Sequence, residues 1–208
     1  MRTPGFITLV LLSLGVSAYA VVAYVFLPLG AVLHPDMRAS FETYRVGVYA
    51  HVFASVAALA LGPFQFSRPL RTRRPGLHRG MGRLYLGVGV LIGGVAGLFM
   101  ALHAFGGWVS RLGFAGLALA WLYTGFRAYL AIRGGDVATH RRWMVRNFAL
   151  TFAAVTLRLW LPASIASGMP FELAYPVIAW LCWVPNLLVA EWYFNRAPQA
   201  RAGRTATG

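Results

Sequence analysis

Six long apolar runs, separated by short arginine-bearing connections, account for most of this 208-residue sequence. A bilayer core of about 30 Å requires about 20 apolar residues in helical conformation. Runs of that length cover residues 6–29, 44–66, 82–104, 112–132, 144–165 and 173–194. Because little chain remains outside them, we predict an all-α polytopic membrane helix bundle. It would have about six transmembrane helices in a single transmembrane domain over residues 1–194.

The composition fits the same class. Hydrophobic residues make up 59% of the chain and charged residues 12%, which is about half the charged share of an ordinary soluble domain. All 19 basic residues are arginine, and the formal net charge is +14. Such a charge can indicate nucleic-acid binding, but these arginines lie at the ends of apolar runs, where topology signals lie. We therefore expect a lipid bilayer as the partner and no nucleic acid.

The distribution of arginine predicts the orientation of the bundle. Connections 67–83 and 127–146 and the C-terminal tail are rich in arginine, whereas the other connections carry fewer arginines together with Asp36, Glu42 and Glu172. Arginine-rich loops stay in the cytoplasm, so both termini are predicted to be cytoplasmic. The exclusive use of arginine and the many alanines and glycines are typical of a GC-rich bacterial genome, which indicates the bacterial inner membrane.

The two ends of the chain raise separate questions. Residues 1–20 resemble a signal peptide, but the apolar run continues to Leu29, which favours an uncleaved first helix and leaves cleavage as the alternative. Residues 195–208 are rich in Arg, Ala, Gly and Thr, and we expect a disordered cytoplasmic tail there.

Polar residues recur on single faces of the predicted helices. Polar groups are costly in lipid, so these faces should point into the bundle. The face of the fifth helix comprises His140, Met144, Asn147, Thr151, Ala154 and Arg158, and that of the second comprises Tyr44, His51, Ser55, Ala58, Gly62 and Gln65. The third helix carries Tyr85 and a glycine face of Gly89, Gly93 and Gly97, which allows close approach of another helix.

The helical rise predicts one polar cluster at the cytoplasmic face. Its expected members are His78, Tyr85, His140, Asn147, Asn186 and Glu191, ringed by Arg83 and Arg146. On the other side of the membrane, His51 and Arg158 are expected about 10 Å below the surface. Arg158 is a candidate for binding a carboxylate or phosphate, because a charged residue at that depth is a functional hypothesis.

Histidines at matching depths on different helices are the arrangement that holds a b-type haem. His78 and His140 are the preferred pair, with nearby arginines available to the propionates. His51 with His103 is a weaker pair. The leading hypothesis is therefore a b-haem or quinone-linked electron-transfer component with a redox partner. A non-haem metal bound by His78 and His140, and purely structural histidines, remain alternatives. The sequence has no CxxCH motif for covalent haem.

Two further functions stay open. Pro185 predicts a break in the sixth helix beside Asn186, and together with Glu191 this break is a candidate cation or proton site in a small proton-coupled transporter. The glycine face of the third helix instead favours a non-catalytic assembly or scaffold subunit, with a homo-oligomer as one form. Nucleotide-binding and hydrolase motifs are absent from the sequence.

Several short strings occur together between residues 45 and 194. They are Leu61-Gly62-Pro63-Phe64-Gln65-Phe66, Leu77-His78-Arg79, Gly82-Arg83-Leu84-Tyr85, Gly113-Phe114 with Trp121, Gly135-Asp136, His140-Arg141-Arg142-Trp143-Met144, Thr156-Leu157-Arg158-Leu159 and Pro185-Asn186 with Glu191. This combination resembles the predicted bacterial membrane proteins grouped as domain of unknown function 2306, which have no settled activity. The resemblance implies that the residues to examine are His51, His78, Arg83, His140, Arg158, Asn186 and Glu191.

A looser similarity is to the cytochrome b561 type of electron carrier, which also has six helices with cytoplasmic ends. In that type, four central helices each supply one haem ligand. Residues 112–132 contain no histidine, so the similarity implies at most the inner haem site, with His78 and His140.

Overall fold

Helices make up the regular structure of the protein. The computed structural model describes residues 3–196, so nearly all of the expected tail at 195–208 lies outside the described residues. Within them the chain forms helices and no strand. Six helical stretches are long and apolar enough to cross a membrane, namely Pro4–Phe26, Arg45–Gln65, Pro75–Leu102, Gly107–Arg133, Val137–Ala166 and Phe171–Phe194. The prediction of an all-α bundle with six spans is confirmed.

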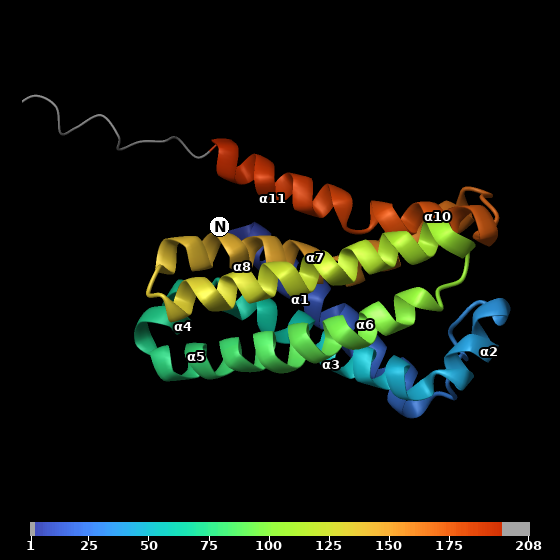
Figure 1. The fold of residues 1–208 in the computed structure, drawn as a ribbon, viewed down its shortest axis with the longest axis horizontal. Helices are drawn as coiled ribbons and strands as arrows, with labels where there is room; N and C mark the ends of the chain where they lie inside the picture. The colour runs from blue at the N-terminus through green and yellow to red at the C-terminus, as the bar shows by residue number, and fades with distance from the viewer. Residues whose placement is uncertain (1–2, 197–208) are drawn as a thin grey trace, which may run out of the picture.

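Most spans consist of more than one helical segment (Figure 1). The first comprises α1 (Thr3–Val21) and the π-helical η1 (Val22–Phe26), and the second is α3 (Arg45–Gln65). The third comprises α5 (Pro75–Leu84), the π-helical η2 (Tyr85–Ile92) and α6 (Gly93–Leu102); the fourth is α7 (Gly107–Arg133). The fifth comprises α8 (Val137–Thr151) and α9 (Ala153–Ala166), and the sixth comprises α10 (Phe171–Leu181) and α11 (Val184–Arg196). Short helices α2 (Pro35–Thr43) and α4 (Arg68–Arg73) lie in connections.

The third and fifth spans begin earlier than their apolar runs. Pro75 occupies the first turn of α5, where its missing N–H costs no hydrogen bond. The carboxylate of Asp136 caps α8 by accepting from the backbone N–H of Thr139 at 2.9 Å, and this bond holds the pKa of Asp136 below its usual value. His78 and His140 therefore lie in the first turns of helices rather than in the loops before them.

Helix α7 occupies the middle of the bundle. It packs against α8 on one side, α6 and η2 on another, and α10 on a third. The first span packs on α3 and α9, and α11 lies along α8 (Figure 1). The third and fifth spans both run away from the end that carries α4, so they are parallel. Because they are parallel, equal steps along the two spans lead to equal changes of depth in the bundle.

The glycine face of the third span packs on α3 within the same chain. A Cβ atom added at Gly89 would lie 2.7 Å from the Cβ of Ala58, and one added at Gly97 would lie 2.8 Å from Nδ1 of His51. Residues spaced four apart do not stay on one face of an α-helix, because it has 3.6 residues per turn. The wider turns of the π segment η2 offset this rotation and keep the three glycines on one face. The face is thus covered by α3, so the structure gives the scaffold hypothesis no free glycine surface.

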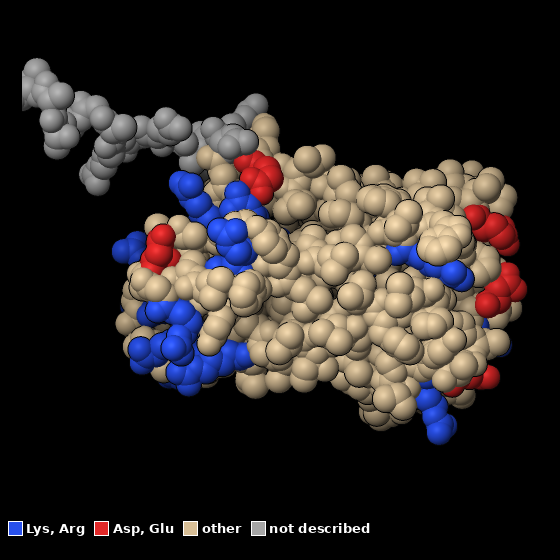
Figure 2. All heavy atoms as spheres, in the orientation of Figure 1, with Lys and Arg blue, Asp and Glu red and all other residues tan. Residues whose placement is uncertain are grey.

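Charged residues gather mostly at the two ends of the bundle, with a broad apolar band between them (Figure 2). We call one the arginine-rich end; it comprises α4 and the adjoining parts of α5, α7 and α8. The opposite end comprises α2 and the start of α10, with Asp36, Glu42 and Glu172. This distribution agrees with a membrane-spanning chain, and the cytoplasmic location of the arginine-rich end stays a prediction from the charge rule.

Two glycines of η2 provide a matched test of this packing. Gly89→Ala should lower the free energy of unfolding by about 1 to 3 kcal/mol, because its methyl group meets the backbone of Ala58 at 3.0 Å. Gly87→Ala should leave stability unchanged or raise it, since nothing lies within 4 Å of the added atom. Detergent-induced unfolding followed by circular dichroism would measure both variants. Equal effects at the two positions would contradict the packing of η2 on α3.

Candidate functional site

A hydrogen-bonded network lies at the centre of the bundle and joins the third, fourth and fifth spans. The hydroxyl of Tyr85 donates to Oδ1 of Asn147 at 2.8 Å and lies 2.8 Å from Oγ1 of Thr151. Nε1 of Trp121 donates to the same threonine oxygen at 2.8 Å. The side-chain amide of Asn147 donates to the carbonyl of Trp121 at 2.7 Å and to Oγ1 of Thr124 at 2.8 Å.

Every polar atom of this network has a partner. The hydroxyl of Thr124 donates a hydrogen bond to the carbonyl of Ala120 at 2.8 Å, and the hydroxyl of Thr151 lies 3.0 Å from the carbonyl of Asn147. Tyr85 and Asn147 are fully buried. A satisfied network of this kind stabilises and orients a core, because breaking any bond leaves a costly unpaired group. The sequence predicts Tyr85 and Asn147 in a polar site; in the structure they join the third, fourth and fifth spans, and a role in binding stays a prediction.

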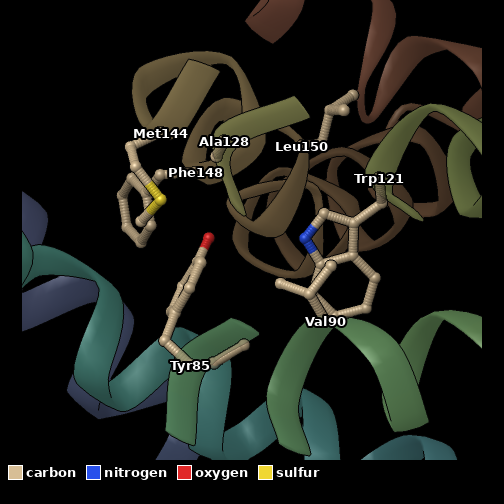
Figure 3. Close-up of a cluster of buried hydrophobic side chains, with 8 residues drawn as sticks. Tyr85, Val90, Trp121, Ala128, Met144, Phe148 and Leu150 are labelled. Carbon is tan, nitrogen blue, oxygen red and sulfur yellow. The ribbon is translucent and has the colours of Figure 1, made fainter. Parts of the chain in front are cut away.

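Apolar side chains surround the network. In Figure 3 the hydroxyl of Tyr85 and the indole nitrogen of Trp121 point into the same space between the helices. Met144 and Phe148 lie beside the Tyr85 ring, and Val90 lies beside Trp121 (Figure 3). This low-dielectric environment strengthens each hydrogen bond.

The sixth span breaks near Pro185, as the sequence predicts. Asn186 donates to the carbonyl of Cys182 at 3.0 Å and to Oγ1 of Thr156 at 3.1 Å, and the hydroxyl of Thr156 donates to that same carbonyl. Proline removes a backbone donor, and neighbouring side chains supply replacements, as they do in membrane helices. The carbonyl of Cys182 at the break is therefore satisfied by side-chain donors of the protein itself.

Glu191, the acidic residue of the proposed transport site, is engaged as well. It accepts two hydrogen bonds from Arg146 of α8, one from Nε and one from Nη2. The guanidinium of Arg146 also lies 4.8 Å from the centre of the Trp143 ring and 4.9 Å from that of Phe194. This bidentate pair joins α11 to α8, so Arg146 does not face the histidines as expected. Glu191 is thus paired within the protein, and the transport hypothesis stays a prediction.

The arginine-rich end contains two histidines with different partners. Nδ1 of His140 lies 2.8 Å from the carbonyl of Ala128 in α7. A carbonyl only accepts, so Nδ1 carries a proton, and in the neutral imidazole Nε2 is then the nitrogen with a lone pair. Nδ1 of His78 is buried and has no hydrogen-bond partner among the described residues. The two imidazoles lie within electrostatic range of one another.

Arginines crowd this pair of histidines from α4 and the starts of α5 and α8. Arg71 and Arg79 lie within electrostatic range of His78. Arg71 is itself close to Arg141 and Arg68, and partial burial together with their charges lowers the pKa of Arg71. Like charges gathered in this way favour binding of an anionic group. Arg83, by contrast, is exposed, and its side chain makes no hydrogen bond or ion pair in the described part of the chain.

Gln65 is an additional candidate at this end. Its side chain is 7% exposed, and Nε2 is buried with no partner within residues 4–194. Its Oε1 would lie 3.2 Å from a Cβ atom added at Gly82, one helical turn beyond His78. The polar stripe of the second helix contains Gln65, and the helical rise predicts it at about the level of His78 and Tyr85. Unpaired buried polar atoms call for a partner.

At the opposite end the remaining candidates have separate partners. Nδ1 of His51 lies 2.8 Å from the carbonyl of Gly93, and Nδ1 of His103 lies 3.0 Å from that of Phe99. No hydrogen bond or ring contact joins the two histidines in the described structure. Arg158 donates to the carbonyl of Ala154 at 2.8 Å and lies 5.5 Å from the Tyr19 ring centre. No carboxylate of residues 4–194 pairs with it.

Comparison with known proteins gives one match. Residues 48–194 match the model of a family described as "Predicted membrane protein (DUF2306)". The matched region begins within α3 and ends within α11, so it includes the central network and both histidines of the arginine-rich end. Neither the curated proteins nor the proteins of solved structure contain a match to the chain.

Removing one hydroxyl tests the network. Tyr85→Phe should lower the free energy of unfolding by about 1 to 2 kcal/mol, because Oδ1 of Asn147 is left buried without its donor. Tyr175→Phe is the matched control, since the hydroxyl of Tyr175 has no hydrogen bond in the described structure. Unfolding in mixed detergent micelles would compare the two. A cost for Tyr85→Phe no larger than that for Tyr175→Phe would show that the network does not stabilise the bundle.

Proposed function

The chain belongs to the family described as "Predicted membrane protein (DUF2306)", and we propose that this member transfers electrons within the membrane. In this proposal it would bind one b-type haem at the arginine-rich end, held by the imidazoles of His78 and His140. The electron partner is a quinone or another redox component of the bilayer. The observations that support the proposal are that Nδ1 of His78 is buried without a hydrogen-bond partner in the described structure, and that the hydrogen bond of His140 to Ala128 uses Nδ1 and leaves Nε2 to act as a ligand.

The central network supports equal depth for the two ligands. Tyr85 follows His78 by seven residues, and Asn147 follows His140 by seven. Seven residues make almost two full turns of an α-helix, about 10 Å of rise, so each histidine lies on the same face as the network residue above it. The two spans are parallel, and Tyr85 bonds Asn147. We therefore infer that His78 and His140 lie at one level, each on the face of its helix that carries the network residue.

The chemistry of the donors also suits iron. The carbonyl of Ala128 fixes the tautomer and the ring orientation of His140, which is how ligating imidazoles are commonly held. His78 has no competing hydrogen bond in the described structure. Arg71, Arg79 and Arg141 offer charge-assisted hydrogen bonds to propionates. When bound, haem supplies a one-electron couple; the protein's own residues orient the ligands and balance the negative charge.

The absorption spectrum tests the proposal. Full-length protein from haem-replete cells should show a Soret band and a pyridine haemochrome of b type. His78→Ala and His140→Ala should each abolish that spectrum, because bis-histidine ligation needs both imidazoles. His103→Ala is the matched control and should retain it, since the imidazole of His103 bonds the carbonyl of Phe99 in its own span and packs on Tyr44.

Each variant must first elute from size exclusion as the unmodified protein does, so that loss of haem is not loss of the fold. Colourless protein from haem-replete cells would overturn the proposal. So would a spectrum that survives both His78→Ala and His140→Ala. A haem-free protein that retains a metal dependent on these two histidines would instead identify a non-haem centre.

A further inference from the structure

We propose that His34, Asp36 and Glu172 form a binding site for one divalent transition-metal ion at the opposite end of the bundle. His34 and Asp36 belong to the connection between α1 and α2 and to the first turn of α2; Glu172 lies in the first turn of α10. One ligand atom from each lies within 4.8 Å of the other two. This site is separate from the proposed haem site and does not depend on it.

The spacing of the first two groups suits a shared metal better than a hydrogen bond. Nδ1 of His34 lies 3.5 Å from Oδ2 of Asp36, beyond the ordinary hydrogen-bond range. Two ligands about 2.0 to 2.1 Å from a tetrahedral ion lie about 3.3 Å apart. The same nitrogen is buried and has no hydrogen-bond partner among the described residues. An ion between the two groups would satisfy it.

Aromatic packing holds the imidazole in place. The His34 ring stacks on Phe171 with centroids 4.1 Å apart and an interplanar angle of 4°. Phe171 in turn packs against Phe105 and Tyr175. Because Phe171 directly precedes Glu172, the residue that orients the histidine also fixes the start of the helix that carries the third ligand. A site held on packed elements in this way needs little reorganisation to bind an ion.

The donor set selects the class of ion. One imidazole and two carboxylates suit zinc, iron, nickel or copper, whereas calcium and magnesium prefer oxygen ligands throughout. The two carboxylates bring two negative charges close together, which a divalent cation would neutralise. Asp36 is 55% exposed, so water can complete the coordination shell. The ion would tie the α1–α2 connection to the start of the sixth span.

Zinc binding to the full-length chain tests the site. The protein would carry no polyhistidine tag, would be stripped with a chelator, and would be dialysed against Zn²⁺ before metal analysis. We expect one zinc ion per chain that His34→Gln and Glu172→Gln each remove. Glu42→Gln and His103→Gln are the matched controls from the same end of the bundle, and both should retain it. Ca²⁺ in excess should not displace the zinc.

The remaining outcomes are decisive as well. Zinc that persists in both His34→Gln and Glu172→Gln would overturn the proposal, and so would a chain that takes up no zinc. Zinc lost only in His78→Ala would assign the ion to the arginine-rich end and would also overturn it. A thermal shift on adding Zn²⁺ that is present in Glu42→Gln and absent in Glu172→Gln would support the site independently, since a ligand stabilises the state that binds it.

Discussion

The hydrogen bond between Tyr85 and Asn147 is the contact on which the arrangement of this bundle depends. Lipid tails are as apolar as the side chains they surround, so burial of apolar surface does not by itself drive helices together in a membrane. Close packing and interhelical hydrogen bonds must do so. Here Gly89 brings the third span against α3, and Tyr85 with Asn147 joins it to the fifth span through a fully satisfied network.

That contact also relates the core to the proposed chemistry. The same seven-residue interval separates Tyr85 from His78 and Asn147 from His140, so fixing the register of one pair fixes the level of the other. The network supplies no ligand, because all of its polar atoms are paired. Its role is to orient two spans whose first turns carry histidines among arginines. The opposite end of the bundle is organised differently, by aromatic packing around His34.

Much of the fold follows from the sequence, because the length and polarity of the six runs leave few alternatives in a bilayer. The inward polar faces also predicted that Tyr85 and Asn147 meet. The structure does not bring all of the predicted polar residues together in one cluster. Their depth in the membrane could be estimated from the sequence, but depth does not determine which helix faces are in contact. Helix α11 packs on α8, where Glu191 pairs with Arg146. Trp121 and Thr124 lay in an apolar run without a marked polar face, and His34 and Glu172 are too distant in sequence for any local pattern to link them.

The central claim is that the Tyr85–Asn147 bond sets the relative position of His78 and His140. Pulsed electron paramagnetic resonance can measure it directly, with spin labels on cysteines at positions 78 and 140 in a Cys182→Ala background. With the network intact, we expect one narrow distance distribution. With Tyr85→Phe and Asn147→Leu together, the distribution should broaden or shift, because the register is no longer fixed. An unchanged narrow distribution in the double variant would show that the Tyr85–Asn147 bond does not set this distance.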